Sequence, residues 1–338
     1  MRIGFNPHKD QKQKASDYFH QIIIPVYIPN QKDYFKDSFQ ILEYCIESLF
    51  KTCHSKTFFT VVNNGSSPEI SNYLNELLAQ RKVHEVIHTT NIGKLNAILK
   101  GLSGHKFKLI TITDADVLFL NNWQEATYEV FSKIPKSGAV SPVPSSRLYN
   151  YYTHNILFEK FFSKSLKFTK VKNPEAMKEF AISVDNSEFY NSNHLNTYLT
   201  VEMSKCKAVV GAGHFVCTYR GDIFADKKEN YSPYNLGGSS ERFFLDKPVV
   251  KKGYWRLSTE DNYAFHMGNV TEPWMGEKLG QLELQRGEIE LLNIKKLHVI
   301  KPYIWISNKL LSIIIAKKSL KKIFLKYKGL SPEALNDY

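Results

Sequence analysis

Residues 108–122, KLITITDADVLFLNN, decide the fold of this 338-residue chain. This short apolar run, rich in β-branched residues, stops at two aspartates one residue apart, Asp114 and Asp116. Side chains at positions i and i+2 of an extended segment lie on the same face, so both carboxylates can converge on one hard cation. The pattern predicts a strand that delivers paired carboxylates to its C-terminal end. The alternative is a solvated turn after a buried strand. The rest of the sequence must decide between a cation site and such a turn.

The composition indicates a globular protein. Hydrophobic residues make up 43% of the chain and aromatic residues 13%, enough to bury a sizeable core in one large domain or two smaller ones. Residues 1–17 are polar and rich in lysine, and no uninterrupted run of about 18 apolar residues occurs, so we expect neither secretion nor a membrane-spanning helix. The cysteines form no CxxC pair, which favours reduced structural thiols over disulfides or a zinc site. They are Cys45, Cys53, Cys206 and Cys217.

The positive charge is concentrated near the end of the sequence. The formal net charge is +12, and residues 295–328 contain ten lysines and no acidic residue. The rest of the chain is therefore close to balanced. A nucleic-acid-binding protein would place basic residues among aromatic ones over a folded face or in a recognisable motif. We therefore expect no nucleic-acid partner.

Strand and helix patterns alternate through the first half of the chain. The predicted strands are residues 21–28, 58–62, 85–89 and 107–113, and the predicted helices are residues 38–51, 68–80 and 93–102. Such alternation is typical of βαβ units and predicts an α/β fold with a parallel sheet. Ligands bind such sheets at the carboxyl ends of the strands, and three of these ends have unusual sequences. They are Pro25-Val26-Tyr27, Asn63-Asn64-Gly65-Ser66 and Asp114-Ala115-Asp116.

Four segments in this order, IIIPVY, VVNNGSS, NIGKLNAILKGL and TITDAD, resemble the nucleotide-binding half of a GT-A glycosyltransferase close to family 2. The resemblance covers about residues 21–122. It implies a GT-A, Rossmann-like, mostly parallel sheet flanked by helices, with a smaller mixed region on the acceptor side and a C-terminal helical tail. We expect an N-terminal extension over residues 1–20, a nucleotide-sugar-binding half over 21–122, an acceptor-binding and catalytic half over 123–290, and a basic amphipathic tail over 291–338.

The second half of the sequence carries fainter family features. Residues 211–224, GAGHFVCTYRGDIF, resemble the segment that precedes the acceptor site. A helical run follows from Glu241, and we expect Ser239 or Ser240 to cap it and Gly253 to end it. In the family, this helix start carries the acidic residue that serves as catalytic base, and a late histidine, here His266, completes the metal site.

The resemblance implies roles for particular residues. Asp116, Asp114 and His266 would hold Mn²⁺ or Mg²⁺, and Glu241 would take the proton of the acceptor hydroxyl. Lys94, at a helix start, would add a positive charge at the diphosphate. The expected nucleotide-binding residues are Pro25, Tyr27, Asn63, Asn64, Lys94, Asp114, Ala115 and Asp116. The family usually has an aspartate at the end of the second strand. Here Asn63 and Asn64 would accept from the base, which we expect to be uracil, more weakly than a charged carboxylate.

Each role has an alternative. Glu241 would also complement a helix dipole, and the pair Glu260-Asp261 competes with it as the base. His266 could be a core histidine, Tyr27 a packing residue and Lys94 a solvated helix-start lysine. For Trp274 we expect a place in the core in preference to a sugar-stacking role.

Residues 305–327 place apolar side chains near helical spacing among six lysines. The apolar residues are Ile306, Leu310, Ile313, Leu320, Phe324 and Tyr327, and the lysines are Lys309, Lys317, Lys318, Lys321, Lys322 and Lys326. This resembles an interfacial helix on anionic lipid, so we expect residues 301–328 to hold a cytoplasmic protein peripherally on the inner face of the cell membrane. The alternative is that residues 306–315 pack against the catalytic domain.

The expected activity is a metal-dependent, inverting glycosyltransferase of the hexosyl or N-acetylhexosaminyl class. It would move a sugar from a nucleotide-sugar, with UDP as the expected nucleotide, to a hydroxyl of a glycan or lipid-linked glycan, as in bacterial surface polysaccharide synthesis. Two alternatives stay open. One is a retaining GT-A transferase or a nucleotidyltransferase with a similar nucleotide half, and the other is a non-catalytic module that binds sugar nucleotides or polyanions.

Overall fold

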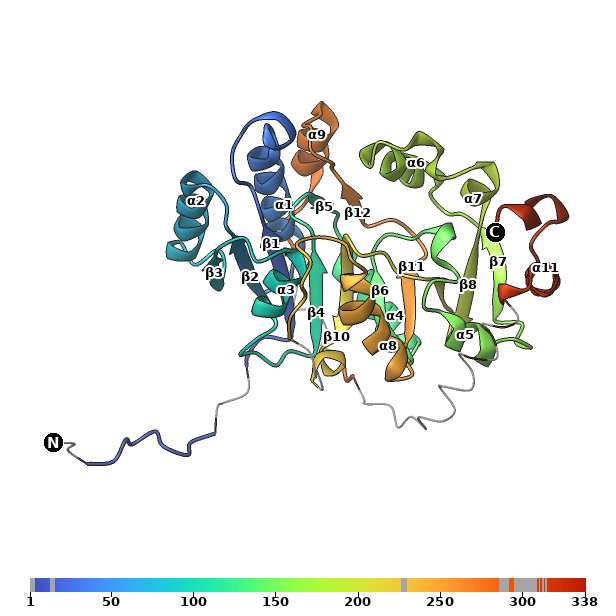
Figure 1. The fold of residues 1–338 in the computed structure, drawn as a ribbon, viewed down its shortest axis with the longest axis horizontal. Coiled ribbons are helices and arrows are strands. Elements are labelled where there is room, and N and C mark those ends of the chain that lie inside the picture. Colours follow the sequence, from blue (N-terminus) through green and yellow to red (C-terminus); the bar gives the residue numbers. More distant parts are fainter. Residues whose placement is uncertain are drawn as a thin grey trace.

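The computed structural model describes residues 4–12, 16–225, 230–285, 292–294, 309, 311, 313 and 315–338. In this part of the chain, one ten-stranded mixed sheet has the order β3-β2-β1-β4-β10-β6-β11-β9-β8-β7 (Figure 1). The strands are β1 His20–Val26, β2 Thr57–Asn64, β3 Glu85–Thr89, β4 Leu109–Thr113, β6 Ser137–Ser141, β7 Leu166–Lys170, β8 Thr197–Met203, β9 Cys206–Val210, β10 Val216–Arg220 and β11 Trp255–Thr259. A separate ribbon pairs β5 Val117–Phe119 with β12 Ala264–His266.

The first four strands form the parallel part of the sheet, as the sequence predicts. β1 pairs in parallel with β2 and β4, and β2 pairs in parallel with β3. The connecting helices are α1 Ser38–Thr52, α2 Pro68–Ala79 and α3 Lys94–Gly101. β10 then pairs antiparallel with β4 and β6, and β7, β8 and β9 form an antiparallel meander at the far edge. The predicted α/β fold with a parallel core and a mixed region beside it is confirmed.

The apolar run of β1 is buried on both faces, as expected of a strand inside a parallel sheet. Ile22 and Ile24 pack in the cluster that includes residues of α1 and α2. Ile23, between them, points the other way and packs with residues of α3. Because side chains alternate along a strand, the three consecutive isoleucines pack against helices on both faces of the sheet.

The remaining helices complete these layers. They are α4 Trp123–Lys133, α5 His154–Glu159, α6 Pro174–Ser183, α7 Ser192–Asn196, α8 Lys247–Lys251, α9 Pro273–Gln281 and α11 Lys318–Tyr327. Short helical turns lie at η1 Asp33–Phe35, η2 Ser146–Leu148, η3 Ser187–Phe189, η4 Gly221–Phe224, η5 Arg242–Asp246 and η6 Pro332–Asn336. All four cysteines are buried and free, in agreement with their expected structural role.

The end of the chain packs on the antiparallel part of the sheet. Phe324 and Leu325 of α11 are buried in the cluster that includes residues of β7 and β8, and Lys328 O accepts a hydrogen bond from Phe168 N of β7 at 2.8 Å. Leu311 is buried in the same cluster and Ile315 packs against it, so a part of the tail does contact the domain. Ile306 and Leu310 lie outside the described residues. Among the described helices, none has the length and apolar character needed to cross a membrane.

Candidate functional site

The acidic turn lies at the carboxyl end of β4, between β4 and β5. Asp114 N donates to Phe215 O at 2.7 Å, which joins the turn to the segment that enters β10. Asp114 lies just outside the strand, and residues 115 and 116 form a turn. The expectation that an i, i+2 spacing points both carboxylates at one cation therefore does not apply, because that rule holds only for extended backbone.

The two carboxylates have different partners. Asp114 Oδ1 lies 2.6 Å from Lys94 Nζ, and Asp116 Oδ2 lies 3.4 Å from His266 Nε2. The β5–β12 ribbon places the histidine, because His266 pairs with Val117 and Met267 N donates to Asp116 O at 2.8 Å. The structure thus brings His266 to Asp116, as the sequence predicts, and directs Asp114 to Lys94. Within the described residues, no three histidine, cysteine or acidic side chains are gathered closely enough to hold a metal ion.

Asp116 nevertheless has the character of a cation ligand. Its Oδ1 is buried and has no hydrogen-bond partner in the described part of the chain. Burial raises the pKa of Asp116, His266 opposes this effect, and Asp114 adds to it. A buried acceptor without a donor is costly, and a hard cation would satisfy it. Asp116 and His266 therefore fit two ligands of Mn²⁺ or Mg²⁺, which commonly keeps further positions for phosphate oxygens.

Lys94 begins α3 beside the acidic turn. Gly93 before it has φ +87°, and Lys94 N donates to Asn235 O at 2.9 Å. Burial opposes the positive charge of Lys94, but the charges of Asp114, Glu241 and Asp116 outweigh burial and raise the pKa of Lys94. The lysine therefore stays charged where a diphosphate would arrive.

Glu241, whose charge contributes to the raised pKa of Lys94, lies at the start of a helix, as predicted. The helix continues as the π-helical turn η5 and then α8, and Gly253 with φ +75° follows its end. The predicted serine cap is wrong, because Ser240 Oγ lies 2.7 Å from Ser232 Oγ and Ser239 has φ +62°. The competing acids are engaged elsewhere: Glu260 pairs with Lys207 at 2.8 Å and Asp261 with Lys172 at 3.3 Å.

The predicted base-binding residues divide into exposed and buried ones. Tyr27 is 41% exposed just beyond the end of β1, with its ring edge against Phe35. Asn63 and Asn64 are both buried. Asn63 Oδ1 accepts from Ser66 N and Asn64 Oδ1 accepts from Ile92 N, both at 2.9 Å. Asn63 thus holds the loop after β2 and Asn64 the loop after β3, so both amide oxygens are engaged within the protein. Pro25 and Ala115 are half-buried, and Trp274 packs against the core as predicted.

A buried charged cluster beside the site was not predicted. Asp246 is fully buried; its Oδ1 lies 2.8 Å from Arg256 Nη2, and His214 Nε2 lies 2.8 and 2.9 Å from its two oxygens. Arg256 also donates to Tyr151 O and Ala212 O. The cluster, formed by His214, Asp246 and Arg256, ties the helix that carries Glu241 to β11 and to the segment before β10. Its one sequence signal is Arg256, a charged residue inside the apolar strand WRLST.

We expect Asp246→Asn to lower the free energy of unfolding by about 3–5 kcal/mol, because the guanidinium of Arg256 would stay buried without a counter-charge. Urea unfolding followed by circular dichroism measures this. Glu175→Gln is the matched control, since Glu175 pairs with Lys178 at an exposed site and its loss should cost under about 1 kcal/mol. Equal effects in the two variants would contradict a structural role for the cluster.

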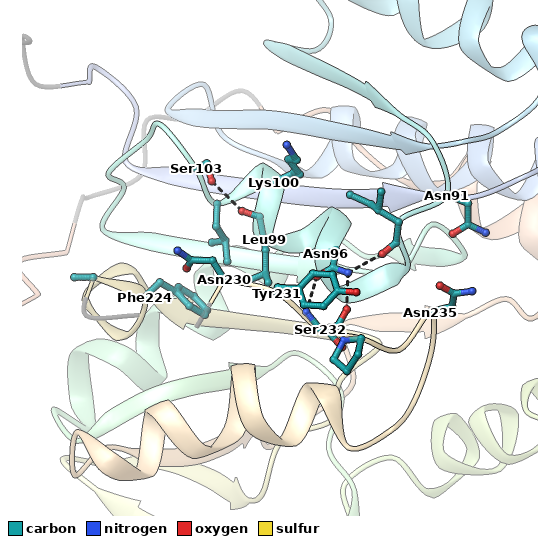
Figure 2. A pocket seen from close by; sticks show the side chains of 14 residues that line it. Asn91, Asn96, Leu99, Lys100, Ser103, Phe224, Asn230, Tyr231, Ser232 and Asn235 are labelled. Carbon is teal, nitrogen blue, oxygen red and sulfur yellow. Dashed lines mark hydrogen bonds between the residues drawn. The ribbon is translucent and has the colours of Figure 1, made fainter. Parts of the chain in front are cut away.

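A pocket of about 810 Å³ lies beside α3. Figure 2 shows Asn96 fixing one wall, where its amide donates to Ile92 O at 2.7 Å and Ser232 O at 2.8 Å. None of Asp114, Asp116, Glu241 and His266 lines it, so this pocket is not the predicted donor site. Its lining residues are Asn91, Ile92, Asn96, Leu99, Lys100, Leu102, Ser103, Phe224, Ala225, Asn230, Tyr231, Ser232, Pro233 and Asn235.

Comparison with known proteins connects the fold to a family. Residues 22–186 match the family described as glycosyl transferase family 2. No curated protein sequence matches the chain. Similar solved structures are S. aureus TarS, at 13% identity over 77% of this chain with a TM-score of 0.42, and S. aureus TarS 1–349 in complex with UDP-GlcNAc, at 12% identity over 92% with a TM-score of 0.45. GalNAc-T7 with UDP, GalNAc and Mn²⁺ is similar at 11% identity over 75% of this chain with a TM-score of 0.48.

The chain spans 38% of the first TarS structure, 71% of the second and 43% of GalNAc-T7. The family match covers β1 to β4, their helices and the acidic turn, which are the elements that form the parallel part of the sheet and its polar edge. Over residues 22–186 the chain therefore resembles glycosyl transferase family 2, and the fold is of the GT-A glycosyltransferase type.

Proposed function

We propose that the protein transfers a sugar from a nucleotide-sugar, with UDP as the expected nucleotide, to an acceptor hydroxyl with inversion at the anomeric carbon. One observation carries the proposal: Asp116, whose Oδ2 lies 3.4 Å from His266 Nε2, has a buried Oδ1 with no hydrogen-bond partner among the described residues. Lys94 lies at the same strand end, and the charges of Asp114, Glu241 and Asp116 act on it. A charged lysine, a cation-ready carboxylate and a second carboxylate suit a diphosphate leaving group and an incoming hydroxyl.

In the proposed reaction, the acceptor oxygen attacks the anomeric carbon, the bond from that carbon to the phosphate oxygen breaks, and Glu241 takes the hydroxyl proton. Lys94 neutralises part of the charge on the departing diphosphate. Asp116 and His266 would hold Mn²⁺ or Mg²⁺, which when bound supplies further positive charge to that leaving group. Asp114, paired with Lys94, would lie nearer the ribose, and Tyr27 offers an exposed ring on which the base can stack.

For the acceptor we propose a glycan or lipid-linked glycan, and for the transferred group a hexosyl or N-acetylhexosaminyl unit. The family resemblance supports this choice. A cytoplasmic protein working at the inner face of the membrane, in bacterial surface polysaccharide synthesis, would suit such an acceptor.

A thermal-shift screen tests the donor class. We expect UDP-GlcNAc, UDP-glucose or UDP-galactose with Mn²⁺ to raise the Tm by several degrees, because a ligand at 100 times its Kd stabilises the folded state by about 2.7 kcal/mol. ATP with Mn²⁺ and each sugar nucleotide with EDTA are the controls. Failure of every nucleotide-sugar to shift the Tm, with or without Mn²⁺ or Mg²⁺, would contradict the proposal.

A further inference from the structure

Helix α11 has apolar residues on two sides. One side is in the core, where Phe324 is 1% exposed and Leu325 is fully buried. Lys328, just after the helix, is also buried, and its Nζ donates to Lys160 O at 2.8 Å and Ser163 O at 3.0 Å. The helix is therefore firmly attached to the domain, and its other side faces outward in a fixed orientation.

The outward side carries a second apolar stripe. Leu320, Ile323 and Tyr327 are 38%, 65% and 56% exposed, and their spacing of three and four residues places them on one helical face. The ring of Phe161, on a neighbouring segment, lies 6.2 Å from the ring of Tyr327, and Phe162 beside it in the sequence is 84% exposed. Leu320, Ile323 and Tyr327 form the outer face of α11.

Lysines border this outer face. Lys318, Lys322 and Lys326 are spaced by four residues, so they form a row along the helix beside the apolar stripe. Lys317, the residue before the helix, is also exposed. The segment from 295 to 328 contains no acidic residue, so nothing within it neutralises these charges. An apolar stripe beside a cationic row is the pattern of a helix that lies in the interface of an anionic bilayer.

We propose that the outer face of α11 docks the protein on an anionic lipid membrane. The helix has ten residues and is about 15 Å long, too short to cross a bilayer, so it would lie in the membrane plane. A soluble polyanion would engage the lysines and leave the apolar stripe in water, whereas a bilayer surface satisfies both. This refines the sequence expectation, because Phe324 belongs to the core and Ile323 to the exposed stripe. The inference stands apart from the proposed transfer reaction.

The test is sedimentation of the full chain with sucrose-loaded vesicles, either of phosphatidylcholine alone or with 30% phosphatidylglycerol. We expect binding to the anionic vesicles that weakens in 0.5 M NaCl, and at least a tenfold loss of affinity in Ile323→Asp. Ile182→Asp is the matched control, since Ile182 on α6 is 64% exposed against 65% for Ile323. Tyr327→Ser is the second variant, in case Ile323→Asp lowers the Tm.

A second set of variants tests the contribution of the lysines to vesicle binding. Removing Lys317, Lys318 and Lys326 together as glutamines should weaken binding about 100-fold, at roughly fivefold per lysine. Removing the exposed Lys32, Lys36 and Lys82 in the same way should have little effect, because they lie at the other end of the sheet. Three results would overturn the proposal: no binding of the native chain to anionic vesicles, equal losses in test and control variants, or RNA binding as tight as vesicle binding that Ile323→Asp leaves unchanged. A dimer in solution that Ile323→Asp dissociates would instead assign the face to a second copy.

Discussion

Asp116→Asn is expected to abolish sugar transfer, with a loss of roughly 10³-fold or more in kcat/KM, and to remove the stabilisation of the protein by UDP-sugar with Mn²⁺. The reason is local. The Oδ2 of Asp116 lies near His266, and its buried Oδ1 has no hydrogen-bond partner in the part of the chain that the structure describes. An amide in place of this carboxylate offers a neutral and much weaker ligand to a hard cation. Release of UDP measures turnover, and calorimetry of UDP binding with and without Mn²⁺ measures the coupling between metal and nucleotide.

The stability of the same variant separates a ligand from a structural residue. Burial raises the pKa of Asp116, so the folded state favours the protonated acid and ionisation at neutral pH costs stability. A neutral amide removes that cost. Asp116→Asn should therefore have an unchanged or higher Tm without metal, while the Mn²⁺-dependent gain disappears. Asp17→Asn, at an exposed site, is the control. A variant that loses Tm without metal, or one that keeps Mn²⁺-dependent UDP binding, would sink the assignment.

Glu241→Gln is expected to leave donor binding intact while kcat falls by about 10²–10⁴-fold. Glutamine keeps the shape and a hydrogen-bonding oxygen but cannot take a proton at neutral pH. Glu241 also helps to raise the pKa of Lys94, yet Asp114 is the larger influence, so the lysine should stay charged in the variant. The kcat for UDP release and the Kd for UDP-sugar, measured separately, distinguish a base from a structural carboxylate.

Glu260→Gln is the control for this experiment, because Glu260 pairs with Lys207 away from the acidic turn. It should retain most of the native kcat. An equal fall in donor affinity and turnover in Glu241→Gln would show a structural role. Product analysis by NMR adds an independent check, since a retained anomeric configuration would remove Glu241 from its role as base.

The parallel part of the sheet is predictable because the apolar pattern of its strands and the residues at its helix starts indicate the same structure. Three consecutive isoleucines at 22–24 require burial on two faces, and Gly93 and Pro68 lie where helices begin. The antiparallel strands β7, β8 and β9 were not predicted. These strands are defined by pairs such as Thr200 and Val209, which lie on different strands. The sequence of one segment does not show which other segment it pairs with.

The residues of the site that follow from local sequence patterns were predictable, and those that depend on contacts between distant segments were not. The end of a strand indicates Asp116, the start of a helix indicates Lys94, and the family pattern indicates His266. The orientation of the Asn63 and Asn64 side chains depends on hydrogen bonds to the loops after β2 and β3, and the residue type does not determine these bonds. The cluster of Asp246 with His214 and Arg256 joins three separate segments, and the π-helical turn places Asp246 where ordinary helical spacing from Glu241 would not.

The strand order also limits how far the acceptor must reach. The acidic turn follows β4, whereas α11 packs beside β7, and these strands are six neighbours apart in the sheet (Figure 1). At about 4.8 Å per strand, they are separated by roughly 29 Å. If α11 rests on the lipid, a hydroxyl close to the bilayer anchor of a short acceptor would fall well short of Asp116. Acceptor length, in addition to sugar identity, would then select the substrate, and graded oligosaccharides should reveal a minimum length for transfer at a membrane.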